Sequence, residues 1–203
     1  MQIQPSLIAV DMDGTFLTDA KTFDTERFSA ILDRLDARGI RFVVASGNTY
    51  AKLQDYMRDF ENRGLIYIAE NGAYLADDSG QLAVHPFREE DVPAIYEVLA
   101  GLKQIGLLVC TTEGIFLPKD RREQIVHVIR NYFEDTGQSI PDTLTLEDFA
   151  GFFFPGAILV DSIEEVRGAP IKFPLLTPPA QTQSINAHLR EVLPEGVAPL
   201  VSG

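Results

Sequence analysis

The sequence of 203 residues predicts an α/β fold in which a parallel sheet covered by helices is followed by a second, α+β domain. Two observations predict this class. Apolar runs at residues 7–10, 40–45 and 65–69 alternate with segments of helical spacing, and strands that are apolar almost throughout are typical of parallel sheets. From about residue 80 the pattern changes to a hairpin, followed by helices that alternate with short strands.

The first domain follows element by element from these patterns. Its first strand ends at Asp11, its second at residues 46–48, and its third at a turn formed by residues 71–72. Two helices are predicted from apolar residues with helical spacing, which are Phe28, Ile31, Leu32 and Leu35 in the first and Leu53, Tyr56, Met57 and Phe60 in the second. The order strand, helix, strand, helix, strand predicts that the three strands pair in parallel.

The second domain follows a predicted hairpin whose turn is formed by residues 77–80. Further helices are predicted over residues 92–105, 123–133 and 181–193, and further strands over residues 107–111, 115–117, 158–160 and 171–176. We therefore expect residues 1–82 to form the N-terminal part of an α/β core and residues 83–195 to form an inserted α+β domain. Residues 196–203 are expected to be the start of a strand that returns to the core and is cut short.

The composition excludes several classes of partner and location. With 30 acidic and 17 basic residues the formal net charge is −13, and such a surface repels nucleic acid and anionic membranes. A single cysteine, Cys110, rules out an internal disulfide and is typical of a reducing compartment. The sequence shows no export signal and no apolar run long enough to span a bilayer. We therefore expect a cytoplasmic protein without a nucleic-acid or membrane partner.

Polar residues gather where the first two predicted strands end. Asp11 and Asp13 lie just beyond the first strand and Ser46 lies just beyond the second. Parallel strands end at one edge of their sheet, where ligands bind in a crevice, so we expect these side chains to share that crevice. Gly14 and Gly47 allow sharp turns that bring backbone N–H groups close to an anion. Two carboxylates, a hydroxyl and exposed amides indicate a site for Mg²⁺ and a phosphoryl group.

The spacing of the two carboxylates also predicts a division of roles. Asp11, nearest the strand end, would attack phosphorus and form an aspartyl-phosphate. Asp13, turned toward it by the bend at Gly14, would protonate the leaving oxygen and later deprotonate the attacking water. The predicted reaction is Mg²⁺-dependent hydrolysis of a small phosphorylated metabolite, such as a sugar phosphate.

Three segments carry a resemblance to a known superfamily. The segment DMDGTFLTD (residues 11–19) resembles the first motif of the haloacid dehalogenase superfamily of phosphatases, and VVASGN (43–48) is similar to its second motif. The segment IAENGA (68–73) resembles one that is characteristic of the Cof-type, sugar-phosphatase-like branch. The resemblance implies a Rossmann-like parallel-sheet core with an inserted α+β cap domain.

Carried onto this sequence, the resemblance implies a role for each matching residue. Asp11 would be the nucleophile and a Mg²⁺ ligand, and Asp13 would be the acid/base and a metal ligand through its backbone carbonyl. Phosphate- and substrate-binding groups are implied on both motifs, namely Met12, Gly14 and Thr15 on the first and Ser46, Gly47 and Asn48 on the second.

The sequence also departs from the family pattern. The family uses a third-motif lysine and a fourth-motif GDxxxD run with a further metal carboxylate, and the resemblance would place both after the cap. Neither motif appears in this sequence, and no GD dipeptide occurs after Asn48. Lys172 lies inside the predicted cap and is interpreted as a cap strand residue. The chain thus resembles the first part of the core plus the cap. An incomplete sheet exposes an edge, so we expect self-association into a homo-oligomer, and we expect weak Mg²⁺ binding.

Several alternatives remain open at this point. The chain could be a binding module, or an inactive fragment of a haloacid dehalogenase protein. A phosphoacceptor domain of the response-regulator type is disfavoured, because no aspartate lies beside Ser46 at the end of the second strand. Ser46 and Asn48 could also cap the helix that follows them, and Glu70 and Asn71 are interpreted as turn residues with structural hydrogen bonds.

Overall fold

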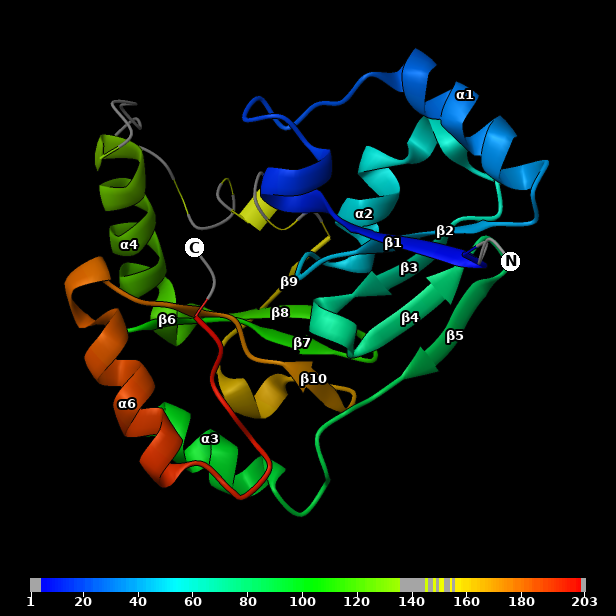
Figure 1. Cartoon of the computed structure of the whole chain (residues 1–203). Coiled ribbons are helices and arrows are strands. Elements are labelled where there is room, and N and C mark those ends of the chain that lie inside the picture. Colours follow the sequence, from blue (N-terminus) through cyan, green and yellow to red (C-terminus); the bar gives the residue numbers. More distant parts are fainter. Residues whose placement is uncertain are drawn as a thin grey trace. The chain divides into compact units, whose positions relative to one another are not determined.

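The computed structural model describes residues 5–135, 145, 148, 150–151, 154 and 156–201 (Figure 1). The chain divides into two compact units, unit 1 (Met1–His85) and unit 2 (Pro86–Gly203). The sequence-based boundary between residues 82 and 83 falls inside the last strand of unit 1. No helix within the described part of the chain is long and apolar enough to cross a membrane.

Unit 1 contains a five-stranded sheet in the order β1-β2-β3-β4-β5. Strands β1 (Leu7–Asp11), β2 (Arg41–Ala45) and β3 (Ile66–Ala69) pair in parallel, which confirms the predicted pairing. Strands β4 (Tyr74–Asp77) and β5 (Gly80–Val84) form the predicted hairpin and extend the same sheet in antiparallel fashion. The hairpin therefore belongs to the sheet that carries the first strands.

Two helices connect the parallel strands. Helix α1 (Thr25–Asp36) begins where the Asp24 side chain accepts a hydrogen bond from the backbone N–H of Arg27. Helix α2 (Tyr50–Tyr56) is shorter than predicted, because the chain leaves the α-helical conformation at Met57 and continues as a 3₁₀ turn that carries Phe60. Helical spacing over residues 53–60 thus continues through a change of helix type.

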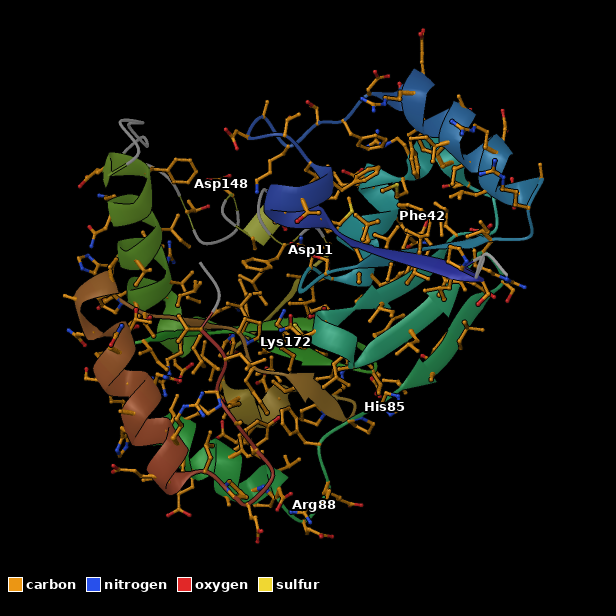
Figure 2. The ribbon with its side chains drawn as sticks, viewed as in Figure 1. Asp11, Phe42, His85, Arg88, Asp148 and Lys172 are labelled. Atoms are coloured by element: carbon orange, nitrogen blue, oxygen red, sulfur yellow. The ribbon has the colours of Figure 1, made fainter. Side chains whose placement is uncertain are left out.

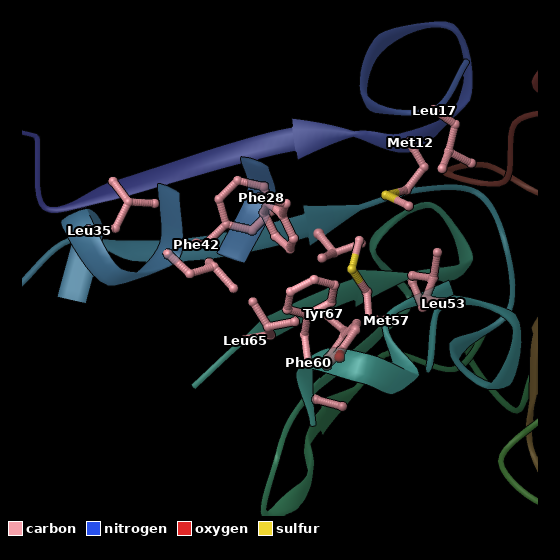
Figure 3. Packing of buried hydrophobic residues seen from close by; sticks show 14 of the residues in the cluster. Met12, Leu17, Phe28, Leu35, Phe42, Leu53, Met57, Phe60, Leu65 and Tyr67 are labelled. Carbon is pink, nitrogen blue, oxygen red and sulfur yellow. The ribbon is translucent and has the colours of Figure 1, made fainter. Parts of the chain in front are cut away.

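The core of unit 1 lies between these helices and the sheet (Figure 3). Phe28 on α1 is 3% exposed, and its ring lies 5.1 Å from that of Phe42 on β2 and 4.8 Å from that of Phe60. From α2, Leu53 packs into the same cluster. Ile31, which the spacing assigns to the buried face of α1, is instead 37% exposed. The packing holds β1 and β2 in a fixed register and so positions the residues that follow them.

Unit 2 contains a four-stranded sheet and a separate two-stranded sheet. The larger sheet has the order β10-β7-β8-β9 and comprises β10 (Pro170–Lys172), β7 (Val109–Thr111), β8 (Gly114–Pro118) and β9 (Ile158–Val160). The smaller one pairs β6 (Gly106–Leu107) with β11 (Leu175–Leu176).

The predictions of continuous strands over residues 107–111 and 171–176 are wrong in detail. Both break, into β6 and β7 and into β10 and β11, and at the break the backbone N–H of Leu108 donates to the carbonyl of Pro174 at 3.0 Å. Pro174 has no N–H group to continue a ladder, which explains the break between β10 and β11. Residues 196–201 form neither a helix nor a strand, whereas the sequence favours the start of a strand there.

In the described part of unit 2, helices pack on both faces of the larger sheet. Helices α3 (Val92–Gly101) and α6 (Thr182–Val192) share one apolar cluster with Phe116, whereas α4 (Arg122–Asp135) shares another with Leu117. Neighbouring residues of β8 therefore face opposite layers. The described residues also include tight turns at Met12–Phe16 and Glu70–Gly72, and 3₁₀ turns at Arg58–Phe60, Lys119–Arg121, Ile163–Glu165 and Pro179–Gln181.

The predicted helix over residues 92–105 ends earlier, at Gly101. Buried Arg121 donates to the backbone carbonyls of Leu102 at 2.6 Å, Leu99 at 3.1 Å and Ala100 at 3.4 Å. These carbonyls lie at the end of α3, where intrahelical partners are missing. The side chain of a distant residue thus takes the place of another helical turn, which the local sequence does not indicate.

Candidate active site

The register of β1 on β2 brings the predicted site residues to one edge of the sheet. Asp11, the last residue of β1, pairs with Ala45, so Ser46 follows one residue beyond this pair. Ser46 is buried, and its backbone N–H donates to the carbonyl of Ile68 at 2.9 Å. Asp11 is exposed where β1 ends (Figure 2). The structure therefore brings the ends of β1 and β2 together, as the parallel arrangement predicts.

A tight turn after β1 presents Asp13 to solvent. Met12 is 1% exposed and packs in the core, and its carbonyl accepts a hydrogen bond from Leu17 N–H at 2.8 Å. Gly14 has φ +71°, a left-handed conformation that other residues rarely adopt. The buried anchor at Met12 and the bend at Gly14 together project the Asp13 side chain outward.

Asn48 links the two motifs. Its side-chain amide donates to Asp13 Oδ2 at 2.7 Å and to Ser46 Oγ at 3.0 Å, and its backbone N–H donates to the same hydroxyl at 3.1 Å. Asp13 and Asn48 are 35 positions apart in the sequence, so only folding joins them. Ser46 and Asn48 do not cap α2, because Thr49 is the N-cap and accepts from the backbone N–H of Lys52.

Lys21 is a member of the site that the sequence analysis missed. Its ammonium lies 2.6 Å from Asp13 Oδ1. This contact is the largest cause of a lowered pKa of Asp13, and the Asn48 hydrogen bond and the more distant charge of Lys52 act in the same direction, while partial burial opposes them. The only sequence signal for Lys21 is its place in the loop that follows the first motif.

The segment after β3 supports the segment after β2. The backbone N–H groups of Glu70 and Asn71 donate to the carbonyls of Asn48 at 3.0 Å and Ser46 at 3.3 Å. A methyl group added at Gly47 would lie 2.6 Å from Asn71 Oδ1, so only glycine fits without a shift. Both Glu70 and Asn71 have positive φ, 51° and 57°. Their interpretation as turn residues with structural hydrogen bonds is confirmed.

Two further residues of the sequence analysis are Thr15 and Lys172. Thr15 is exposed and takes no part in the hydrogen bonds described above. Lys172 lies on β10 of unit 2, as its interpretation as a strand residue requires (Figure 2). Among the described residues, no group of three or more His, Cys, Asp or Glu side chains is arranged to hold a metal ion.

A cavity of about 240 Å³ in unit 1 lies outside the predicted site. It is lined by Tyr50, Gln54, Glu61, Asn62, Tyr67 and Asp78. Burial is the largest cause of a raised pKa of Tyr67, so its phenol stays protonated in the physiological range. None of the residues with predicted roles in the chemistry lines this cavity, so it supplies no part of the phosphoryl site.

Comparisons with known proteins agree with the motifs. A family model of haloacid dehalogenase-like hydrolases matches residues 8–165. The chain is 32% identical over 157 residues to the 5-amino-6-(5-phospho-D-ribitylamino)uracil phosphatase YbjI of Escherichia coli (strain K12), and the match covers 77% of this chain and 56% of that protein. The chain thus spans little more than half the length of this relative.

Solved structures show the same fold. SMU.1108c from Streptococcus mutans UA159 is 28% identical with a TM-score of 0.71, covering 93% of this chain and 63% of that one. A haloacid dehalogenase-like hydrolase from B. subtilis is 21% identical with a TM-score of 0.56, covering 84% and 59%. Because the family model spans most of the chain, this protein belongs to the haloacid dehalogenase-like hydrolase family, as its first two motifs predicted.

Proposed function

We propose that this protein is a phosphatase that hydrolyses a small phosphorylated metabolite through an aspartyl-phosphate on Asp11. One observation carries the proposal. The Asn48 side chain joins Asp13 to Ser46, so that a carboxylate and a hydroxyl from two motifs lie beside the end of β1, where Asp11 is exposed. Membership of a hydrolase family and a phosphatase relative support the same reaction class.

The proposed chemistry has two steps. In the first, a carboxylate oxygen of Asp11 bonds to phosphorus while the ester P–O bond breaks, and its electron pair stays on the leaving oxygen, which takes a proton from Asp13. In the second, a water oxygen bonds to phosphorus and gives a proton to Asp13, while the bond between phosphorus and Asp11 breaks and its electron pair returns to the Asp11 carboxylate. This step releases inorganic phosphate. Ser46 and the backbone N–H groups near Gly47 would donate to the phosphoryl oxygens.

The oxygen donors near Asp11 suit a magnesium ion. The Asp11 carboxylate and the backbone carbonyl of Asp13 would hold it, because Mg²⁺ prefers oxygen ligands. Both carboxylate oxygens of Asp13 already accept hydrogen bonds from Lys21 and Asn48, which favours its carbonyl as the ligand. When bound, Mg²⁺ would offset the repulsion between anionic Asp11 and an anionic substrate.

The test is phosphate release by the purified chain with Mg²⁺ over a panel of sugar and nucleotide phosphates. We expect release by the wild-type chain, its loss in Asp11→Asn, and its retention in Asp19→Asn, which alters an exposed carboxylate of the same motif segment. Acid quenching followed by peptide mass spectrometry should find phosphate on the Asp11 peptide. Equal release by the wild-type chain and Asp11→Asn would contradict the mechanism. Absence of release from every substrate would favour the binding-module alternative.

A further inference from the structure

We propose that Lys21 is a phosphoryl-binding residue. Its ammonium group moves from Asp13 to the phosphoryl group when substrate enters the site. The inference rests on the proposed function and names a further residue of the same site. It starts from one contact. Lys21 Nζ lies 2.6 Å from Asp13 Oδ1, although the two residues are eight positions apart and belong to a turn and a loop.

The loop that carries Lys21 is closed on itself. The backbone N–H of Thr18 donates to the carbonyl of Thr22 at 2.8 Å, and their two hydroxyls lie 3.0 Å apart. Within this closed loop the Lys21 N–H donates to the Thr18 carbonyl at 2.9 Å, and Lys21 has φ +57°. The left-handed conformation of Lys21 directs its side chain back to the first motif.

Two features of Lys21 indicate more than a structural role. Its backbone has a left-handed conformation, which is unfavourable for a residue other than glycine. Its ion pair with Asp13 is exposed, with the two side chains 57% and 44% exposed, and such pairs add little stability. Strain that brings a charged group to a reactive centre is typical of functional sites.

The negative charge at the site favours contact between the Lys21 ammonium and a bound phosphoryl group. Asp11 and Asp13 are both carboxylates, and a phosphate monoester adds further negative charge beside them. Lysine carries three N–H donors on a flexible side chain, so a short rotation can move a donor from a carboxylate to a phosphoryl oxygen.

Binding of inorganic phosphate in the presence of Mg²⁺, measured by isothermal titration calorimetry, tests this role without turnover. Lys21→Met keeps an unbranched side chain, one heavy atom shorter, and removes the charge, and we expect phosphate affinity to fall by about tenfold or more. Lys21→Arg keeps the charge, and its affinity should stay within about threefold of wild type. Lys103→Met is the matched control, because Lys103 is an exposed lysine of unit 2.

A structural role predicts a different pattern. If Lys21 only holds the loop, Lys21→Gly should lower Tm and phosphate affinity together. We expect instead that Lys21→Gly keeps Tm, since glycine adopts positive φ without steric cost, while phosphate affinity is lost. Unchanged phosphate affinity in Lys21→Met, or no phosphate binding by the wild-type chain, would overturn the inference. Phosphate binding that depends on Lys21, without phosphate release from any ester, would support Lys21 and contradict the hydrolytic reaction alone.

Discussion

The side-chain amide of Asn48 donates to Oδ2 of Asp13 at 2.7 Å and thereby joins the segment after β2 to the turn after β1. Lys21 holds the other oxygen of the same carboxylate. Asp13 is therefore oriented by two donors from two different segments. In the proposed reaction Asp13 transfers the proton, and this orientation would hold it in place before substrate binds, which reduces the entropy lost in reaching the transition state.

Removal of the Asn48 amide should loosen Asp13. We expect Asn48→Ala to lower kcat/KM by roughly 10- to 100-fold, because misplacement of a proton-transfer group by about 1 Å has effects of this size. Steady-state kinetics would measure the change, with Asn131→Ala as the control on an exposed side of α4. Wild-type kinetics in Asn48→Ala would show that Lys21 alone orients Asp13.

The lowered pKa of Asp13 predicts a pH dependence with a definite sign. A carboxyl whose pKa is lowered on folding stabilises the native state above its unfolded pKa, and this contribution disappears as pH falls through the folded pKa. Lys21→Met should therefore lower the free energy of unfolding at pH 7, by less than about 1 kcal/mol because the pair is exposed. Well below the ordinary pKa of 3.8, wild type and variant should be equally stable. Urea denaturation at both pH values tests this, and a difference that persists in acid would contradict the assignment.

Gly47 should not tolerate a side chain. In Gly47→Ala the added methyl group would lie 2.6 Å from Asn71 Oδ1, so Asn71 or the backbone must move. We expect a loss of about 1–3 kcal/mol of unfolding free energy, the range for overpacked sites. Gly101→Ala is the matched control, since a methyl group added there would meet nothing within 4 Å and the φ of Gly101 is not positive. Equal stability of the two variants would contradict the close contact.

Arg121 should be essential for the stability of unit 2. Its guanidinium is buried and donates to three carbonyls at the end of α3, so Arg121→Met leaves these acceptors without that partner. We expect a loss of about 2–4 kcal/mol, since buried acceptors without a donor are costly. Neighbouring Arg122 is exposed, and Arg122→Met should change stability by less than about 0.5 kcal/mol. Similar Tm values for the two variants would contradict this role.

Much of unit 1 was predictable because its signals are local. Apolar runs that end in polar residues at Asp11 and Ser46 indicate strands of a parallel sheet, and strand ends of such a sheet meet at one edge. The same sequence pattern also places Gly14 in a sharp turn, where its φ is +71°. Fold class, hairpin and the grouping of the two motifs therefore follow from periodicity and from a few residue types.

Contacts between distant segments were decided by the tertiary structure alone. The Lys21 side chain contacts Asp13, and the Arg121 side chain donates to a carbonyl at the end of α3. No local sequence pattern specifies either partner. The break at Leu108 likewise depends on pairing with a segment far away in the sequence, where its backbone N–H donates to the carbonyl of Pro174. Local propensity determines which elements form and where they approximately end. The position of a charged group in space depends on packing and on backbone strain that the whole fold sustains, and for that reason the full environment of Asp13 emerged only from the folded chain.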